Sequence, residues 1–561
     1  MDKDLKITPD KAQTFPDMRG PWLPRKTQVR LLLLTDDEGS FSEEDKFGLT
    51  ELVQTLESTP GVFMEVKVTK AHRDTATEMF TEPANADVQG FRFDNTGHFN
   101  PANFDQIWLI GVREKVSGAL ALSQAELKVV AQFMDNGGGV FATGDHQDLG
   151  AALCAEIPRV RSMRKWTYDY THDYETYNPA SAEGPPVYGS HRHDTLVQGH
   201  DAAFTFDDQS DDIPAQISPT FYGIKNKYFG FRYPHPILCG PGGIIDVLPD
   251  HMHEGECVVP SNLSKSYTFA GYSTVEYPTG PNGQVIPDVI AQGEVFAHVT
   301  DNTGIGGIVD VVSNPRMFGS IGAYDGHEAN VGRVVVDSTF HHFMNINVIA
   351  SGAVSSDPVK QVGFAYSVSG QKAYDQIRAY WRNIALWLAR PSQQLGMFHR
   401  TFWAARWDSQ LRMVLPGLRH SRKPSWPELM QYGSSVRTTL GRLTSPCASY
   451  TWFFAWDNPL ARFKWWLLLT LPDPPWEMDD VLINPEEYML GAFGAVMMEL
   501  VRATPSRNPK FRDSLDNEMP NVVRKGLAVA AQTAAPHYEK RINETRKMLA
   551  AIRASSKKGR R

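Results

Sequence analysis

Short runs of apolar residues that alternate with helical patterns constrain the fold of this chain most strongly. The runs lie at residues 29–35, 62–68, 104–111 and 140–143. The first of them, VRLLLLT, is almost uninterrupted, which is typical of a strand buried on both faces. Strands that alternate with helices predict right-handed βαβ units and therefore a parallel sheet. We expect an α/β fold for this part of the chain.

Helical patterns separate these runs. One pattern opens at Ser42 and carries apolar residues as far as Leu56, and Ser42 is a suitable N-cap. A second helix is expected from Ser123 to about Asp135, directly before three glycines at 137–139. Both helices have the length and position of crossover helices between parallel strands.

The regular alternation stops after Gly150. Residues 155–330 are rich in Gly, Pro, Tyr and His, and they predict a large loop-rich insertion with short strands at best. A further buried strand is expected at 332–337, and an amphipathic helix that Pro391 ends is expected at 374–388.

The two ends of the chain differ from its middle. Residues 1–26 are polar and interrupted by prolines, which predicts an N-terminal arm and leaves 27–390 as one α/β domain. Residues 391–561 hold eight of the 13 tryptophans, and helices are expected at 519–535 and 538–552. We expect a mainly helical C-terminal domain with an aromatic core; a tryptophan-lined ligand groove is the alternative.

Charge is unevenly distributed along the chain. Residues 391–561 hold 25 Lys and Arg against 15 Asp and Glu, a net charge of +10, so the remaining residues carry −18 within a total of −8. A body this acidic argues against nucleic-acid binding. The basic C-terminal part is expected to pack against the acidic body.

The cysteines and the longest apolar run indicate the compartment. Four cysteines, at 154, 239, 257 and 447, show no close pairing, which favours a reducing cytoplasm. The run at 465–471 is well short of the roughly 20 residues that a membrane-spanning helix needs. We expect a soluble cytoplasmic protein without a membrane partner, and the sequence leaves a homo-oligomer open.

Four motifs follow one another along residues 27–390. The first is GGGVFATGDH, which ends at His146, and the second is the HP pair at His235 followed by an acidic turn near Asp250. The third is GRVVVDSTFH, which ends at His341, and the fourth is the NIALW helix segment that begins at Asn383.

In order and spacing, these motifs resemble the ThuA family, which has a glutamine-amidotransferase-like fold. The resemblance implies a flavodoxin-like, doubly wound parallel sheet and an association with sugar utilisation. The chain departs from the family in three ways. His146 lies two positions further from the glycines, the middle segment is larger, and residues 391–561 have no counterpart.

The amidotransferase nucleophile is missing from the expected turn. That turn reads Thr143-Gly144-Asp145-His146, and the nearest thiol, Cys154, comes eight residues after the histidine. No G-x-S-x-G elbow is present either, so neither a cysteine nor a serine nucleophile is supported.

Histidines are concentrated in the middle of the chain, where 12 of the 17 lie between His146 and His342. Alternate residues of an extended segment point the same way, so an H-x-H pair can offer two imidazoles to one cation. Adjacent residues face opposite sides, so at most one of His341 and His342 belongs to a shared site. The predicted metal ligands are His146, His251, His253 and His341, with Asp145 or Glu254 as the general base.

A basic and aromatic segment follows the elbow. Arg159, Arg161, Arg164 and Trp166 could grip an anionic or sugar-like substrate, with His191 and His193 as further substrate-binding candidates. The alternative is a set of surface arginines that pair with the acidic body.

Two functions therefore remain. The first is a metal-dependent enzyme, a hydrolase or lyase that uses a zinc or iron-group divalent ion on a small polar, carbohydrate-related substrate. The second is a non-catalytic binding or scaffold module, in which the histidine loops are structural.

Overall fold

The computed structural model describes residues 25–58, 64–74, 85–114, 121–145, 149–169, 186–188, 215–225, 230–240, 242–250, 255–281, 283–295, 298–301, 309–312, 316–350, 362–366, 368, 370–414, 423–443, 485–504 and 514–558.

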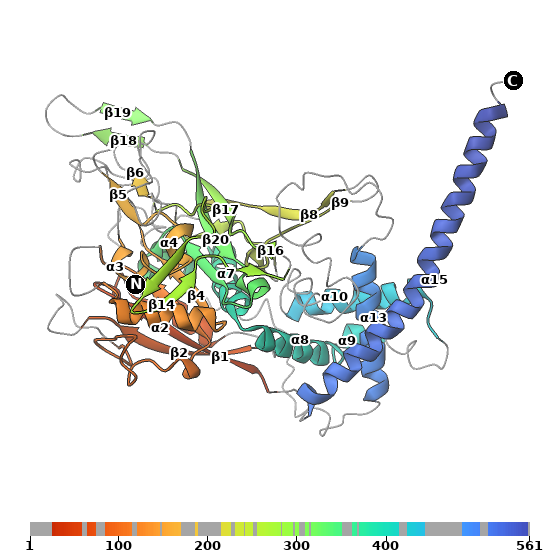
Figure 1. The fold of residues 1–561 in the computed structure, drawn as a ribbon, viewed down its shortest axis with the longest axis horizontal. Coiled ribbons are helices and arrows are strands. Elements are labelled where there is room, and N and C mark those ends of the chain that lie inside the picture. The colour runs from red at the N-terminus through yellow and green to blue at the C-terminus, as the bar shows by residue number, and fades with distance from the viewer. Residues whose placement is uncertain are drawn as a thin grey trace.

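One large mixed sheet forms the centre of the α/β part (Figure 1). Its nine strands follow the order β12-β7-β17-β20-β21-β4-β3-β1-β2. The parallel strands are β1 (Thr27–Thr35), β2 (Met64–His72), β3 (Gln106–Ile110), β4 (Gly139–Thr143) and β21 (Val334–Asp337). Each overlaps a run predicted as a strand, so the α/β class is confirmed.

The segment predicted as a loop-rich insertion completes the same sheet. Four strands of this segment extend the sheet beyond β21, and each is antiparallel to its neighbour. They are β20 (Arg316–Tyr324), β17 (Asp288–Val295), β7 (Ala215–Pro219) and β12 (Val247–Leu248). The expectation of short strands at best is wrong, because β20 is nine residues long. Gly319 lies where a Cβ would overlap the carbonyl oxygen of Cys257. The strand therefore requires glycine at position 319, and glycine is a residue type that makes a strand harder to predict from sequence.

Helices cover both faces of the parallel strands. They are α1 (Thr50–Glu57), α2 (Gln124–Asp135), α3 (Ala151–Cys154), α4 (Val160–Met163), α5 (Asn345–Ile349) and α7 (Gln371–Leu388). Leu31 and Leu33 of β1 belong to the core that includes α1 and α7, whereas Leu32 and Leu34 belong to the core that includes α2. All four are fully buried, which explains the uninterrupted apolar run.

Helix α1 begins later than predicted. Leu49 is its N-cap residue instead of Ser42, and neither side chain supplies the cap. Asn345 does so from far along the chain: its Oδ1 accepts from Thr50 Oγ1 at 3.2 Å and from Glu51 N at 3.3 Å. Its Nδ2 also donates to the Ser42 carbonyl at 3.1 Å. A tertiary contact thus satisfies the helix terminus.

The helices predicted at 123–135 and 374–388 are confirmed. Ser123 is the N-cap of α2 and forms a capping box with Glu126. Helix α7 ends at Leu388, and Pro391 then occupies the first turn of the next helix, where proline is well tolerated.

The C-terminal part is helical in its described residues, as predicted. Its helices are α8 (Pro391–Ala405), α9 (Ser409–Val414), α10 (Trp426–Leu443), α13 (Pro485–Ala503) and α15 (Leu515–Lys558). The two helices predicted near the C-terminus are one continuous helix of 44 residues, which contains both Pro520 and Pro536. No helix in the described parts of the chain has the length and apolar character needed to cross a bilayer.

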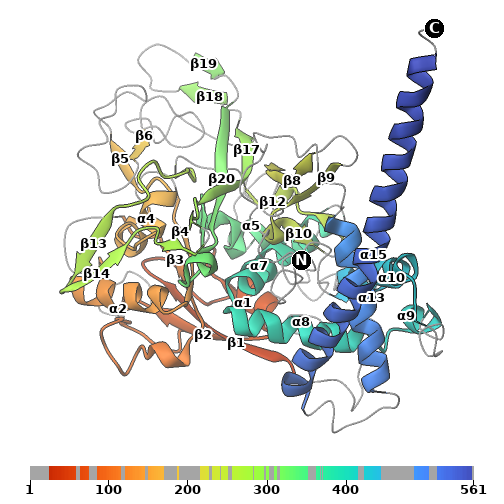
Figure 2. The same cartoon turned by 45° about the vertical axis from the view of Figure 1, so that its right-hand side comes forward.

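Helix α8 attaches the helical part to the sheet (Figure 2). Gln393 Nε2 donates to the Gln28 carbonyl of β1 at 2.9 Å, and Arg400 Nε donates to the Arg25 carbonyl at 2.6 Å. One apolar core runs from β1 through Phe398 of α8 to the later helices. In the described residues the predicted packing is confirmed, and it combines this apolar core with hydrogen bonds to backbone carbonyls.

The four sequence motifs meet at the amino edge of the sheet. Asn383 Nδ2 donates to the carbonyls of Ile237 and Cys239 beside the HP turn, at 3.0 and 2.9 Å. Arg333 Nη1 donates to the Trp387 carbonyl at 2.9 Å, and its guanidinium lies 4.5 Å from the Trp387 ring.

The HP histidine belongs to this junction. The ring centroids of His235 and Trp387 are 4.9 Å apart, and His235 Nδ1 accepts from Ile237 N at 3.3 Å. Burial, and then the Arg333 charge, lower the pKa of His235 to about 3, so it stays neutral. Its role is that of a buried turn residue.

Glycine at 332 is required by this junction. A Cβ on Gly332 would overlap the carbonyl oxygen of Gly138, whereas a Cβ on Gly242 would meet nothing within 4 Å. We expect Gly332→Ala to lower the free energy of unfolding by about 2 kcal/mol or more, because backbone must move to make room. Gly242→Ala should change it by less than about 0.5 kcal/mol. Urea denaturation followed by tryptophan fluorescence measures both free energies of unfolding. Equal values for the two variants would contradict the requirement for glycine at 332.

Candidate functional site

The carboxyl ends of β4 and β21 carry the candidate site. The two strands are parallel neighbours, with Thr143 of β4 in register with Asp337 of β21. Asp145 follows β4 by two residues, which is the position predicted for it, and it is fully buried. Phe340, His341 and His342 form a short 3₁₀ turn after β21. Open α/β sheets bind their ligands at this edge.

Asp145 and His341 face each other across the two strand ends. Thr339 Oγ1 donates to Asp145 Oδ1 at 2.6 Å, and His341 Nε2 lies 3.5 Å from Asp145 Oδ2. On the other side of the ring, His341 Nδ1 lies 2.8 Å from Asn347 Oδ1. The imidazole is 16% exposed, so solvent reaches a site whose carboxylate is buried.

The hydrogen bonds of His341 determine which ring nitrogen carries a proton. With the Asn347 amide oriented so that Oδ1 faces the ring, the oxygen only accepts, and this orientation places a proton on His341 Nδ1. In the neutral ring, Nε2 then presents a lone pair toward Asp145 Oδ2. Two acceptors 3.5 Å apart repel unless a positive group lies between them. That group is either a second proton on the ring or a cation.

A second carboxylate–histidine pair lies behind the first and is fully buried. His342 Nδ1 lies 2.7 Å from Asp337 Oδ1, and His342 Nε2 lies 3.1 Å from the Asp250 carbonyl. Tyr380 OH donates to Asp337 Oδ2 at 2.6 Å. The Asp250 carbonyl only accepts hydrogen bonds, so His342 Nε2 carries a proton. A second proton lies between His342 Nδ1 and Asp337 Oδ1. Since neither side chain is exposed, we regard this pair as structural.

Thr339 and Arg164 connect the two pairs. Thr339 N donates to Asp337 Oδ1 at 3.2 Å, while its hydroxyl donates to Asp145. Arg164 Nη2 donates to the carbonyls of Asp145 at 2.8 Å and Ser338 at 2.6 Å, and its Nε donates to the Asp337 carbonyl at 3.0 Å. The relative position of the strand ends is therefore fixed by two side chains.

The basic and aromatic segment, which was predicted to bind substrate or to lie on the surface, is buried. Arg159, Arg161, Arg164 and Trp166 are each at most 2% exposed. Arg159 Nε donates to the Glu276 carbonyl at 3.0 Å, and its Nη2 pairs with Asp135. The Arg161 guanidinium lies 4.0 Å from the Tyr267 ring, and Trp166 Nε1 donates to the Val160 carbonyl at 3.2 Å. These side chains contact other protein groups, and Arg164 contributes to the site only by donating to the carbonyls at the strand ends. They are not surface arginines.

Most of the predicted histidines lie outside the described residues. This holds for the predicted ligands His146, His251 and His253, for Glu254, and for the substrate-binding candidates His191 and His193. Among the residues that the structure does describe, no group of three or more His, Cys, Asp or Glu side chains could hold a metal ion.

Sequence reasoning missed a second group of charged residues on the same edge. Asp36 follows β1, Asp74 follows β2 and Arg113 follows β3. Arg113 Nη2 donates to Asp74 Oδ2 at 2.6 Å, while the backbone N–H groups of Val112 and Arg113 donate to Asp36 Oδ1 at 2.7 and 3.2 Å. The only sequence signal is that Asp36 and Arg113 come soon after apolar runs; Asp74 comes six residues after the run that ends at 68.

Two oxygens of this group have no hydrogen-bond partner in the described structure, Asp36 Oδ2 and Asp74 Oδ1. Burial raises the pKa of Asp36 to about 6, although the backbone N–H groups of Val112 and Arg113 oppose the shift. The side chain is 1% exposed.

Burial disfavours Cys154 and Cys257 as nucleophiles. Cys154 is buried, and burial followed by the nearby Asp36 charge raises its pKa well above the usual value, which disfavours the thiolate. Cys154 and Cys257 are free thiols, whereas Cys239 is disulfide-bonded. The spacing of the cysteines therefore did not exclude a disulfide, and a reducing compartment stays a prediction.

Comparison with known proteins gives no relative. No family model, no curated protein and no solved structure matches the chain.

The buried carboxyl of Asp36 predicts how stability depends on pH. Its pKa is about 6 in the folded chain and near its ordinary 3.8 when unfolded, so the folded state binds the proton more tightly. Stability should then fall as the pH rises from about 4 to 6, by about 3 kcal/mol in total. Asp36→Asn keeps an acceptor for both N–H groups, so it should be about 1–3 kcal/mol more stable than wild type at neutral pH.

Asp105 provides the matched control. Burial would raise its pKa, but hydrogen bonds from Arg30 outweigh burial and lower it. Asp105→Asn should therefore destabilise the protein at neutral pH and least at low pH. Thermal unfolding of both variants from about pH 4 to 8 measures this, and a destabilised Asp36→Asn would show that its charge is needed.

Proposed function

We propose that this chain is a metal-dependent hydrolase or lyase that acts on a small polar substrate at the Asp145–His341 pair. The observation that carries the proposal is the 3.5 Å separation of His341 Nε2 and Asp145 Oδ2. A divalent cation held by both would remove the repulsion between two acceptors that Asn347 otherwise imposes.

The donors around His341 suit such an ion. Histidine ligands commonly donate their other ring N–H to a carbonyl or carboxylate, which fixes the tautomer and raises the basicity of the ligating nitrogen. Asn347 Oδ1 is in that position at 2.8 Å from Nδ1. Asp145 is oriented in the same way by the Thr339 hydroxyl.

The further ligands are proposed to be His146, His251 and His253. Of the two predicted general bases, Asp145 is taken up by the cation in this arrangement, so Glu254 is the proposed base. Described residues on either side of 251–254 support this: the Asp250 carbonyl accepts from His342, and Gly255 leaves no space for a Cβ against the Arg164 guanidinium. A bound zinc or iron-group ion would lower the pKa of a coordinated water to about 7. The base would take the proton from that water at a carboxylate oxygen.

We also propose that the parallel half of the sheet is ThuA-like and flavodoxin-like. Its five strands lie in the order β2-β1-β3-β4-β21, which in chain order is the 2-1-3-4-5 arrangement of flavodoxin-like folds. Contacts among the four motifs at the amino edge support a shared structural origin. Sugar-related substrates follow from the resemblance alone.

A non-catalytic binding module is the alternative. The observation that favours it is that several predicted site residues are buried in the core, namely Arg159, Arg161, Arg164 and Trp166. In that case the second ring proton of His341, and not a metal, would lie between the ring and Asp145.

Zinc titration of chelator-treated protein distinguishes these functions. We expect about one zinc per chain, bound more weakly near pH 5.5 than near pH 7.5 because the ligands must lose protons. His341→Ala should lower the affinity by more than tenfold, and Asn347→Leu by about 10–100-fold. His537→Gln, in helix α15, is the matched control and should bind as wild type.

Circular dichroism and the unfolding transition confirm that the variants fold. Zinc affinity unchanged by His341→Ala and by Asp145→Asn would show that the ion binds elsewhere. Absence of binding for zinc, iron and manganese would favour the binding module.

A further inference from the structure

The parallel part of the sheet reverses its direction of winding at strand β1. Strand β1 pairs in parallel with β2 on one side and with β3 on the other. Helix α1, between β1 and β2, belongs to the core on one face of the sheet, whereas α2, between β3 and β4, belongs to the core on the opposite face. The carboxyl ends of β1 and β3 therefore form a topological switch point, which is where open α/β sheets bind ligands.

Two carboxylates lie together at this switch point. Asp36 Oδ1 accepts from the backbone N–H groups of Val112 and Arg113, at 2.7 and 3.2 Å. Asp74 Oδ2 accepts from Arg113 Nη2 at 2.6 Å and from Asp37 N at 3.0 Å. Both carboxylates thus contact Arg113, and the N–H group that binds Asp74 directly follows Asp36 in the chain.

Each of the two carboxylates keeps one oxygen without a partner among the described residues. These atoms are Asp36 Oδ2 and Asp74 Oδ1, and both are buried. The two residues are 1% and 0% exposed, so bulk water does not solvate the oxygens. An unsatisfied buried acceptor is costly, and buried charges are ordinarily paired or bound to a metal ion.

The local charge suits a divalent cation. Asp36, Asp37 and Asp74 carry three negative charges and Arg113 carries one positive charge, which leaves a net charge of −2. Arg113 is already paired, since its Nη2 lies 2.6 Å from Asp74 Oδ2 and 3.4 Å from Asp37 Oδ1. The side chains of Asp37 and Arg113 are 33% and 23% exposed, so the outer side of the cluster reaches solvent.

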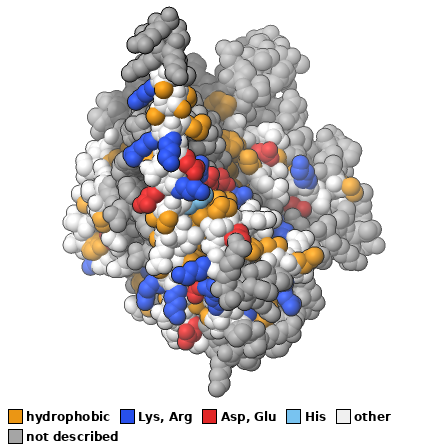
Figure 3. Space-filling view, turned by 90° about the vertical axis from the view of Figure 1, so that its right-hand side faces the viewer, with side chains coloured by type: hydrophobic (Ala, Val, Ile, Leu, Met, Phe, Trp, Pro, Cys, Tyr) orange, Lys and Arg blue, Asp and Glu red, His pale blue; other side chains and the backbone are white. Residues whose placement is uncertain are grey.

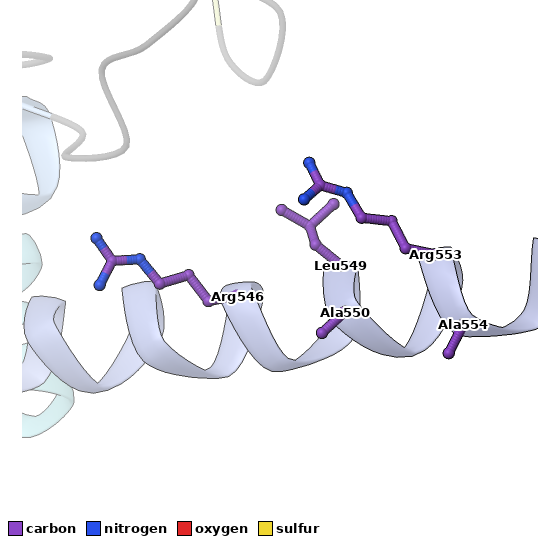
Figure 4. Close-up of a pocket in the computed structure, with 5 residues that line it drawn as sticks. All are labelled: Arg546, Leu549, Ala550, Arg553 and Ala554. Atoms are coloured by element: carbon purple, nitrogen blue, oxygen red, sulfur yellow. The ribbon is translucent and has the colours of Figure 1, made fainter.

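The shallow hollow on helix α15 offers no comparable set of ligands. Five residues of this one helix line it, Arg546, Leu549, Ala550, Arg553 and Ala554 (Figure 4). Figure 3 shows Lys and Arg side chains beside hydrophobic ones along the same helix. None of the five lining residues has a carboxylate, and the two arginines repel a cation.

We propose that Asp36 and Asp74 bind a magnesium ion at the switch point, through Asp36 Oδ2 and Asp74 Oδ1. Magnesium takes oxygen ligands, keeps several waters and is usually held by only one or two carboxylates. Two protein ligands are fewer than the groups of three or more that the described residues lack. Carboxylate oxygens favour magnesium, whereas imidazole favours zinc, so this site does not depend on the chemistry at His341.

Isothermal titration calorimetry of the chelator-treated full chain with magnesium chloride tests the site. We expect about one magnesium ion per chain. Asp36→Asn and Asp74→Asn should each lower the affinity by more than about tenfold, because loss of a ligand should cost at least as much as loss of its outer partners. Asparagine keeps an acceptor for the N–H groups at each position, so both variants should fold, which circular dichroism checks. Magnesium should raise the unfolding temperature of the wild type but not of the two variants.

Asp288→Asn is the matched control. Asp288 is partly buried, accepts from Tyr222 OH at 2.6 Å, and belongs to β17, five strands from β1 in the sheet. This variant should bind magnesium within about twofold of wild type, and so should His341→Ala, which separates the test from that of the zinc site. No magnesium binding up to about 10 mM would overturn the proposal. Binding that both Asp36→Asn and Asp74→Asn leave unchanged would also overturn it.

Discussion

The buried guanidinium of Arg164 is the contact on which the candidate site depends. It donates to the carbonyls that end β4 and β21, at Asp145, Asp337 and Ser338. Burial lowers the pKa of Arg164, and the nearby Cys257 and Asp145 charges oppose that shift. A buried cation is stable only when its donors are satisfied, so the strand ends are held where those three carbonyls converge. The Asp145–His341 distance follows from that geometry.

The amino and carboxyl edges of the sheet differ in role, and two of the sequence motifs run from one edge to the other. In GGGVFATGDH and GRVVVDSTFH, the first glycines and Arg333 lie at the amino edge, where Gly332, Gly138 and Trp387 pack together. Each strand then leads to the opposite edge, where Asp145 and His341 follow. The amino edge requires particular residues for packing, whereas the carboxyl edge carries the groups that can do chemistry. A pattern that specifies the amino edge therefore predicts fold better than it predicts reaction.

Local patterns predicted the elements whose causes are local. The strand at Leu31–Leu34 is apolar because both faces are buried, and the helix after Ser123 carries its own capping box. Helix α1 could not be placed correctly, since its cap is Asn345, 294 residues from Glu51.

The arginine segment was misread for the same reason. Three arginines in a short stretch predict side chains that face solvent or substrate unless their partners are known. The partners of Arg159 are Asp135 and Glu276, from helix α2 and from a loop 117 residues away. The candidate site was predicted in part, because position after a strand is readable in sequence, whereas the proton arrangement set by Asn347 and Thr339 is not.

The adjacent histidines show how one short turn separates two roles. On an extended strand, His341 and His342 would face opposite sides of the sheet, but they lie in a 3₁₀ turn and reach two different carboxylates. His342 is fully buried with Asp337, Tyr380 and the Asp250 carbonyl around it, so any proton it holds is fixed by the fold. His341 has the same partner types but keeps 16% of its side chain exposed. Only this ring can exchange a proton or accept a cation from solvent without opening the core. The turn therefore assigns stability to one histidine and leaves the neighbouring one available for chemistry.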